Sequence, residues 1–317
     1  MDVKIEQPGA DGLAWTLRIP GKDREWRWTH FDLLFAEARR SIETHPELPE
    51  FARQVLTGID ETPRIVSEGM VVAGVLPAYA RTGDAEEFDV TCWHFAMTPD
   101  CLVTGRRRAT RTLINLWEAM RRGLNPADPS ALIDLCITEF ARGARVRLAA
   151  LASELDPVED MLIEGRDASG QTDYGGRVGS VRREATRLKR ALTPLARALD
   201  MDADDLPEWA GFSESGAGRR ALAGALDDIA ALYDRARSLQ DELTTRLAEE
   251  TNRRLYIVSV VTTLFMPATF VTGFFGMNTG GLLWGGEEVP HGTFFAAVVC
   301  GLAVAVTLLL LRAKRML

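Results

Sequence analysis

The stretch LYIVSVVTTLFMPATFVTGFF, residues 255–275, contains no charged side chain. A second uncharged stretch, TFFAAVVCGLAVAVTLLLL, occupies residues 293–311. As α-helices, segments of this length reach about 30 Å, which matches the thickness of the hydrocarbon core of a bilayer. The sequence therefore predicts a C-terminal hairpin of two transmembrane helices, 255–275 and 293–311, joined by residues 276–292.

Charged residues around the hairpin predict how it crosses the membrane. Five basic residues flank the two stretches, namely Arg253, Arg254, Arg312, Lys314 and Arg315. The connecting segment has no Lys or Arg and carries Glu287 and Glu288. Because basic flanks favour the cytoplasmic side, both ends of the hairpin are expected in the cytoplasm, including the basic tail 312–317.

A row of mostly small and polar residues begins just before the first stretch and runs along it. They recur at alternating steps of three and four, at Asn252, Leu255, Ser259, Thr262, Met266, Thr269 and Gly273. We call this row the heptad seam. It is typical of identical helices around a common axis, and polar groups in a bilayer favour contact with other helices or with water. One hairpin cannot enclose a path, so a pore needs several copies. The alternative is ordinary helix packing through small residues.

Residues 218–254 predict a long amphipathic stalk helix. Neither Pro nor Gly interrupts the chain from Ala225 to Met266. Apolar residues mark one face at steps of three and four: Leu222, Leu226, Ile229, Tyr233, Ala236, Leu239, Leu243 and Leu247. This spacing indicates a helix that continues into the first transmembrane stretch, for a total of roughly 80 Å. A coiled-coil stalk is the alternative. Extended backward, the heptad seam places Asp241, Asp234 and Asp227 on the axial side, unless they form a solvated face.

The part of the chain before the hairpin, residues 1–250, predicts a cytoplasmic body in two parts. Residues 1–122 mix predicted strands (13–19, 26–29, 64–78 and 88–104, with a turn at Pro99-Asp100) with helices (31–56, broken near Pro46 and Pro49, and 110–122). Residues 123–130 are rich in Gly and Pro, and residues 130–217 are mostly helical, with helices over 130–154 and 178–199 around a loop at 165–176.

Charge and motif content limit the functions of this body. The formal net charge is −8, and the basic C-terminal segment leaves residues 1–250 at −11. An acidic body repels nucleic acid, which we exclude as a partner.

Cys92 and His94 lie on one face of a predicted strand and are a candidate cytoplasmic zinc site, unless they are buried strand residues. No phosphate-binding loop or hydrolase motif is found, so we expect no enzyme.

The first uncharged stretch ends in Gly276-Met277-Asn278, after Thr251-Asn252 at the membrane boundary and Phe265-Met266-Pro267 within the span. This arrangement resembles the signature of CorA-type metal ion transporters, over residues 251–311 by motif and over residues 1–250 by architecture. The resemblance implies a CorA-like homopentamer with an α/β cytoplasmic funnel domain, a long stalk helix and a two-helix transmembrane hairpin.

The same resemblance implies roles for individual residues. Gly276, Met277 and Asn278 would form the pore mouth, where five Asn278 amides hold a divalent cation through its water shell. Gly276 permits the turn that presents this ring. Met266 would form an apolar constriction, and Thr269 and Gly273 a narrow polar segment.

The residues after the tripeptide narrow the expected cargo. Thr279-Gly280-Gly281 resembles the ZntB branch of the family, which is associated with zinc and similar metals such as cadmium, nickel and cobalt. The branch implies a bacterial inner membrane, a metal ion as transported substrate rather than cofactor, and proton coupling as an option, with either direction of transport. Glu287, Glu288 and His291 could concentrate cations at the mouth, or form a solvated turn.

Two other functions remain open from the sequence. A magnesium or cobalt channel of the same fold would keep every predicted element and change only the cargo. A membrane-anchored oligomeric sensor or scaffold that conducts nothing would need the stalk and the hairpin, but it does not account for the polar seam.

Overall fold

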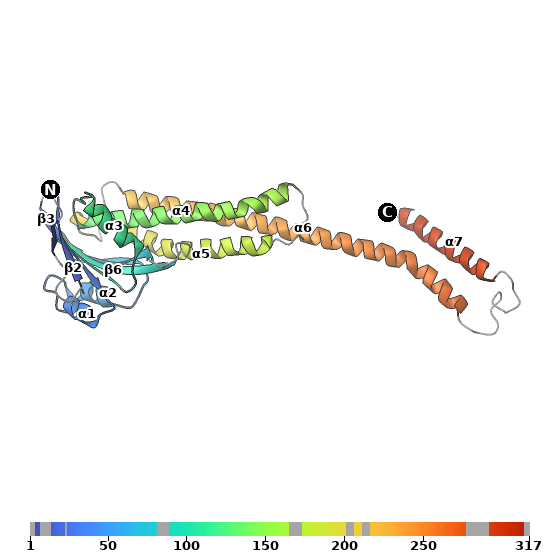
Figure 1. Cartoon of the computed structure of the whole chain (residues 1–317), viewed down its shortest axis with the longest axis horizontal. Coiled ribbons are helices and arrows are strands. Elements are labelled where there is room, and N and C mark those ends of the chain that lie inside the picture. Colours follow the sequence, from blue (N-terminus) through green and yellow to red (C-terminus); the bar gives the residue numbers. More distant parts are fainter. Residues whose placement is uncertain are drawn as a thin grey trace. The chain divides into compact units, whose positions relative to one another are not determined.

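The computed structural model describes residues 4–6, 14–22, 24–80, 89–164, 173–200, 206–210, 216–276 and 292–313. The chain forms two compact units, Met1–Gln240 and Asp241–Leu317. The first unit holds a β-sheet and most of the helices, and the second holds the end of the longest helix and the C-terminal helix (Figure 1). The finer predicted boundaries, at residues 122, 130, 217 and 254, stay predictions.

Seven strands form one mixed sheet. They are β1 (Lys4–Glu6), β2 (Ala14–Pro20), β3 (Glu25–Asp32), β4 (Arg64–Glu68), β5 (Val71–Tyr79), β6 (Val90–Thr98) and β7 (Cys101–Arg106). Their order across the sheet is β1-β2-β3-β7-β6-β5-β4. Only β3 and β7 pair in parallel, with Thr29 opposite Val103, and the other neighbours are antiparallel. The central strands β5, β6 and β7 are buried almost throughout, as strands covered on both faces are.

A buried polar cluster joins the neighbouring strands β3 and β7. The Nε1–H of Trp28 on β3 donates to Oγ1 of Thr104 on β7 at 2.9 Å. The Nδ1 atom of His30 lies 2.8 Å from the same Thr104 oxygen. Burial, helped by the positive charge of Arg106, lowers the pKa of His30 to about 3, so the ring stays neutral. A shift in the β3–β7 register would break these hydrogen bonds and leave buried polar atoms unpaired, which is costly. The cluster therefore favours the observed register.

Helices of the first unit contact the sheet, and the chain continues into the helices of the second unit. The helices are α1 (Ala36–Glu43), α2 (Glu50–Thr57), α3 (Arg111–Arg121), α4 (Pro129–Ile163), α5 (Tyr174–Leu199), the short 3-10 helix η2 (Glu208–Ala210), α6 (Ala217–Gly276) and α7 (Gly292–Ala313). Helices α1 and α2 share one apolar core with the sheet, centred on residues such as Ile42, Leu56 and Val75. Helices α3, α4 and α5 contact β4, β5 and β6. The sheet-bearing unit is thus a layered α/β body from which α4, α5 and α6 extend (Figure 1).

A close approach seats α4 on the sheet. The Tyr79 ring of β5 stacks on Phe140 of α4 with ring centroids 4.8 Å apart, and its hydroxyl donates to the Phe140 carbonyl at 3.1 Å. Gly143, one turn further along α4, lies against the same ring, and a Cβ there would come within 2.4 Å of it. A side chain at residue 143 would therefore push α4 away from β5.

Some elements differ from the sequence-based expectation. Phe31 and Asp32 close strand β3 instead of starting a helix, because they pair with Gly105 and Arg106 of β7. The predicted strand 64–78 is two strands, β4 and β5, which turn at Gly69 with a positive φ of 59°. The break near Pro46 and Pro49 does separate two helices, α1 and α2.

Two helical boundaries also differ. Helix α4 continues to Ile163, well past the predicted end at residue 154, through Pro157. The lost hydrogen bond is tolerated because Val158, Met161 and Leu162 still bury an apolar face beyond the proline. Helix α5 starts at Tyr174, inside the predicted loop, where the Asp173 carboxylate caps it by accepting the Gly176 N–H at 2.8 Å.

Candidate functional site

The heptad seam lies within the broad exposed surface that α6 presents in the second unit, where off-seam residues such as Val261 and Phe265 are exposed as well. Every described seam side chain from residue 252 onward is exposed: Asn252, Leu255, Ser259, Thr262, Met266, Thr269 and Gly273. The Thr262 and Thr269 hydroxyls donate to carbonyls one turn back, Val258 at 2.8 Å and Phe265 at 2.9 Å. Their donors are thus satisfied within the helix, and the hydroxyl oxygens stay on the open face as acceptors.

The opposite face of α6 contacts α7. Its half-buried residues form a separate stripe: Val260, Leu264, Pro267, Ala268 and Val271. On α7 the covered residues are Cys300, Ala303, Val304, Thr307 and Leu311. The Cys300 thiol lies 3.8 Å from the Ala268 carbonyl, which shows that these stripes face each other. At 3.6 residues per turn, the seam lies about half a turn from the α7 side. The polar face is therefore left open by the chain's own hairpin.

Length and exposure agree with a membrane location for this part of α6. The helix is long and apolar enough to cross a membrane, and none of its most apolar 18-residue stretch is buried inside the chain. A soluble core helix would be mostly buried, and a signal sequence would lie near the N-terminus. In the part of the chain that the structure describes, α7 adds the shorter apolar run Ala297–Ala313. The second predicted span, 293–311, lies within α7 and stays a prediction.

The stalk part of α6 shows the same division in the first unit. Most of the apolar row packs inward, with Leu222, Ile229, Ala236, Leu239 and Leu243 buried and Leu226 half-buried. Two of its predicted members, Tyr233 and Leu247, are exposed instead. The aspartates Asp227 and Asp234 are exposed, and so is Asp241 in the second unit. Exposure fits both an axial face that awaits other copies and a solvated face. The axial role of the three aspartates stays a prediction.

The predicted mouth lies mostly outside the described residues. Gly276 is the last residue of α6. Met277, Asn278, Glu287, Glu288 and His291 all fall in the segment 277–291, which the structure does not describe. Their predicted roles therefore rest on the sequence.

Cys92 and His94 lie on the face of β6 that packs against α2, and each is occupied by protein atoms. The Cys92 thiol donates to the Glu61 carbonyl at 3.0 Å, and burial, with Glu61 and Asp60 nearby, raises its pKa to about 12. Burial of this kind, with the thiol engaged by a backbone carbonyl, is typical of a structural cysteine. Within the described ranges, no group of three or more His, Cys, Asp or Glu side chains could hold a metal ion. The geometry supports the alternative of buried strand residues.

His94 instead ties β6 to α2. Its Nδ1–H donates to the Val55 carbonyl at 2.8 Å, and its Nε2 accepts from the Arg107 guanidinium at 3.1 Å. Arg107 continues to the Thr57 carbonyl at 2.8 Å. Burial lowers the pKa of His94 to about 4, against the hydrogen bond to Val55 and helped by Arg107. Both ring nitrogens are used, so neither is available to a metal.

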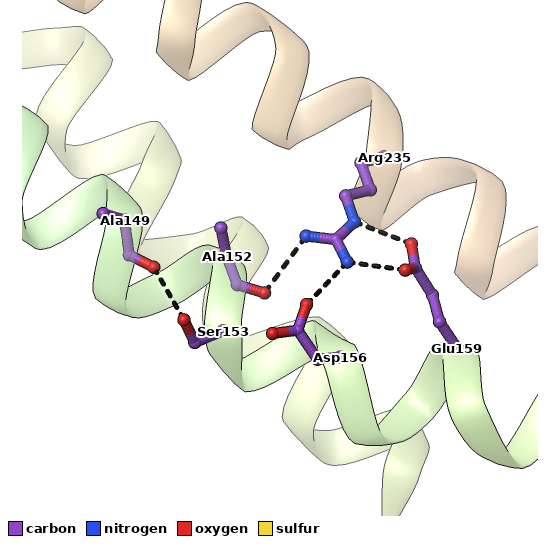
Figure 2. A network of polar contacts seen from close by, with 6 residues as sticks. All are labelled: Ala149, Ala152, Ser153, Asp156, Glu159 and Arg235. Carbon is purple, nitrogen blue, oxygen red and sulfur yellow. Dashed lines mark hydrogen bonds and ion pairs between the residues drawn. The ribbon is translucent and has the colours of Figure 1, made fainter.

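Sequence reasoning missed the polar contacts that hold α6 to α4. Arg235 of α6 binds the Glu159 carboxylate through two hydrogen bonds of 2.6 Å, and it also donates to Asp156 at 2.8 Å and to the Ala152 carbonyl at 3.2 Å (Figure 2). These hydrogen bonds lower the pKa of Glu159 and raise that of Arg235. The three-residue spacing of Asp156 and Glu159 places both carboxylates on one face and was a visible signal. No signal in the sequence indicated that Arg235, 76 residues beyond Glu159, is the partner of these carboxylates.

Two further contacts fix the start of α6. Arg145 of α4 pairs with Asp228 at 2.8 Å. The buried Asp134 carboxylate of α4 accepts the Gly218 N–H at 3.0 Å in the first turn of α6. Burial raises the pKa of Asp134, while the Gly218 hydrogen bond and Arg220 oppose the shift. A carboxylate at a helix N-terminus also complements the helix dipole. Helix α6 is thus anchored to α4 at several points along the sheet-bearing unit.

Replacing Arg235 by glutamine should lower the free energy of unfolding by about 1–2 kcal/mol. The bidentate pair is charge-assisted, but about a third of each side chain is exposed, which reduces its value. Thermal unfolding of the purified protein in detergent measures the loss. The matched control is Arg246→Gln, because Arg246 pairs with Glu242 one turn away on the same helix. An equal loss in both variants would show that the α4–α6 contact contributes no more than an exposed ion pair within one helix.

The comparisons with known proteins agree with this arrangement. The family model described as CorA-like Mg2+ transporter protein matches residues 23–315. The divalent cation transporter CmaX of Pseudomonas aeruginosa is 25% identical over 283 residues, covering 86% of this chain and 82% of that protein. The zinc transport protein ZntB of Yersinia pseudotuberculosis is 25% identical over 296 residues, covering 90% and 87%.

Solved structures show the same fold. Full-length CmaX superposes with a TM-score of 0.75 at 24% identity, covering 92% of this chain and 89% of that one. The CorA magnesium transporter of Methanocaldococcus jannaschii superposes with a TM-score of 0.65 at 16% identity, covering 98% and 96%. The family match spans nearly the whole chain, from the sheet to the last helix. The chain therefore belongs to the CorA-like Mg2+ transporter family, a family of divalent cation transporters.

Proposed function

We infer that this chain carries divalent cations, with zinc preferred, along the axis of a homopentamer lined by the heptad seam. The observation that carries the proposal is the exposed polar face of α6, which lies opposite the stripe that contacts α7. A hairpin whose second helix covers one side of the first leaves the polar side for other copies. Polar groups left facing lipid would be costly, so a shared axis is the arrangement that satisfies them.

Zinc as the preferred cargo rests on the sequence around the mouth. Gly280-Gly281 follows the Gly276–Asn278 tripeptide, and Glu287, Glu288 and His291 are ligand types that suit zinc. A relative named for zinc transport shares 25% identity with this chain. Magnesium is the second candidate, because the description of the family model that matches the chain names a Mg2+ transporter.

The seam and the flanking charges also support a membrane setting. We propose a bacterial inner membrane with both termini in the cytoplasm. The basic residues lie just before the first span and just after the second, and none lies in the loop between them. The ring of five Asn278 amides would then stand on the external side. Such a ring can hold a cation through its water shell, which suits ions that dehydrate reluctantly.

Flux into liposomes tests the proposed cargo. The purified protein is reconstituted into liposomes that are loaded in each case with a calibrated dye for the metal under test. Zinc is compared with magnesium, cobalt, nickel and cadmium, with and without an imposed pH gradient. We expect zinc to enter fastest, and a pH-gradient dependence would indicate proton coupling. Faster magnesium flux would favour the magnesium channel. A verified pentamer that admits no divalent cation would favour the sensor or scaffold and would contradict the transport proposal.

Replacing Asn278 by alanine should reduce zinc flux by roughly tenfold, the equivalent of about 1.4 kcal/mol for lost contacts between the amide ring and the hydrated ion. The measurement is the initial rate of dye response in matched liposomes. Thr279→Ala is the control, since it shortens the neighbouring side chain outside the tripeptide and should leave the rate within about twofold. Parental flux in Asn278→Ala would show that the amide ring does not select the ion.

A further inference from the structure

Helix α5 is strongly basic in an acidic chain. Its 26 residues carry seven basic side chains, Arg177, Arg182, Arg183, Arg187, Lys189, Arg190 and Arg197, and one acidic side chain, Glu184. The whole chain has a formal net charge of −8. Glu184 is already occupied, because Arg147 of α4 binds it through two hydrogen bonds of 2.5 and 2.6 Å. The positive charge of α5 is therefore not balanced along its own length.

Four of these arginines gather at one groove between α5 and α6. The groove has a volume of about 440 Å³, and its lining includes Arg182, Arg183, Thr186, Arg187, Arg190 and Gln240. We call it the arginine groove. It lies entirely within the first unit. Its volume falls within the range of pockets that hold small ligands.

One arginine of the groove is held in place by α6. The Arg182 guanidinium donates to the Gln240 side-chain oxygen and lies over the Tyr233 ring, 5.6 Å from its centroid. Arg182 therefore joins the two helices that form the walls of the groove. A pre-positioned guanidinium loses less freedom when it binds a ligand.

The other three arginines form a row that makes no ion pair among the described residues. Arg183, Arg187 and Arg190 are exposed, and among the described residues none has an ion pair or side-chain hydrogen bond. Their spacing of four and three residues places them on one helix face, over about 10 Å. Like charges at this spacing repel each other, and an anion between them relieves the repulsion. Guanidinium groups match phosphate oxygens in a bidentate geometry.

We propose that the arginine groove binds a soluble anion carrying two or more linked phosphate groups. A row of three guanidiniums suits several phosphates in sequence better than one. A soluble source is favoured over a lipid headgroup, because Gln240 precedes the start of the uncharged span at Leu255 by about 22 Å of helix. The Arg182–Gln240 contact already links the groove to the stalk helix α6. The proposal does not depend on transport or on the identity of the cargo.

Calorimetric titration of the full-length, metal-free protein in detergent tests the site. Sodium triphosphate should bind at least tenfold more tightly than orthophosphate. The double variant Arg183→Gln/Arg187→Gln should weaken triphosphate binding at least tenfold. The matched control, Arg177→Gln/Arg197→Gln, removes the same charge from the same helix outside the groove and should bind within about threefold of the parent. Glutamine keeps helix propensity, and circular dichroism verifies that both variants fold.

Three results would overturn the proposal. Absence of triphosphate binding would remove the site. Equal weakening in the groove variant and the control would indicate general attraction to a basic helix. Binding to phosphatidylglycerol vesicles that depends on Arg183 and Arg187, without triphosphate binding in detergent, would assign the groove to a membrane surface instead.

Discussion

Replacing Thr262 by tryptophan should stop divalent cation flux in reconstituted liposomes, with a fall of at least roughly tenfold. Thr262 lies at the middle of the heptad seam, on the face of α6 opposite the stripe that contacts α7. In a homopentamer the substitution places five indole rings around one axis. The rings narrow the path and replace hydroxyl acceptors with apolar surface, which also excludes water from a constriction.

The neighbouring position is the matched control. Val261 is also exposed, but it lies about 100° around the helix from Thr262 and outside the seam. Val261→Trp adds the same ring on a face expected to meet lipid or a neighbouring helix, and it should leave flux within about twofold. Size-exclusion chromatography verifies that both variants assemble. If Thr262→Trp conducts like the parent, the exposed face does not line the path. If both variants lose flux equally, bulk alone is responsible.

Replacing Trp28 by alanine should destabilise the sheet-bearing unit by about 3–5 kcal/mol. Trp28 is 0% exposed at the junction of β3 and β7, and its ring meets that of Trp15 edge-to-face with centroids 4.7 Å apart. The substitution leaves a large cavity and removes the donor to Thr104, the shared centre of the buried polar cluster. In a unit of this size the loss corresponds to a fall in Tm of roughly 10 °C.

Circular dichroism of the full-length protein in detergent follows this unfolding. Trp117→Ala is the control, since Trp117 is half-buried and its ring faces the Arg121 guanidinium at 4.9 Å. It makes the same chemical change where water already reaches the ring, and it should cost about half as much or less. Equal falls in Tm would mean that the β3–β7 junction is not a special source of stability.

Local sequence patterns were sufficient for the elements that depend on local spacing. The apolar row of the stalk and the heptad seam both recur at helical intervals, and the stretch 255–275 has no charged residue to interrupt it. The structure has a single helix over all three. The break at Pro46 and Pro49 was also local, because a proline restricts its own backbone and that of the residue before it. The family resemblance, carried by Gly276-Met277-Asn278, is confirmed by the match over residues 23–315.

Elements that depend on distant partners were not predictable in this way. Phe31 and Asp32 read as the start of a helix, but pairing with Gly105 and Arg106 of β7, far later in the chain, makes them strand. Helix α4 was expected to end before Pro157, but its buried face beyond the proline extends it. In both cases tertiary contacts outweigh a weak local preference.

The sequence by itself determined the hairpin, the heptad seam and the family, because charge, length and helical period act within one segment of chain. Only the tertiary structure decided which face of α6 is free, since that depends on where α7 packs. It also decided that Cys92 and His94 are buried strand residues with protein partners, that Arg235 joins α6 to the carboxylates of α4, and that Gly143 must lack a side chain beside Tyr79. Each of these depends on atoms brought together from distant positions, and burial then sets the cost of leaving them unpaired.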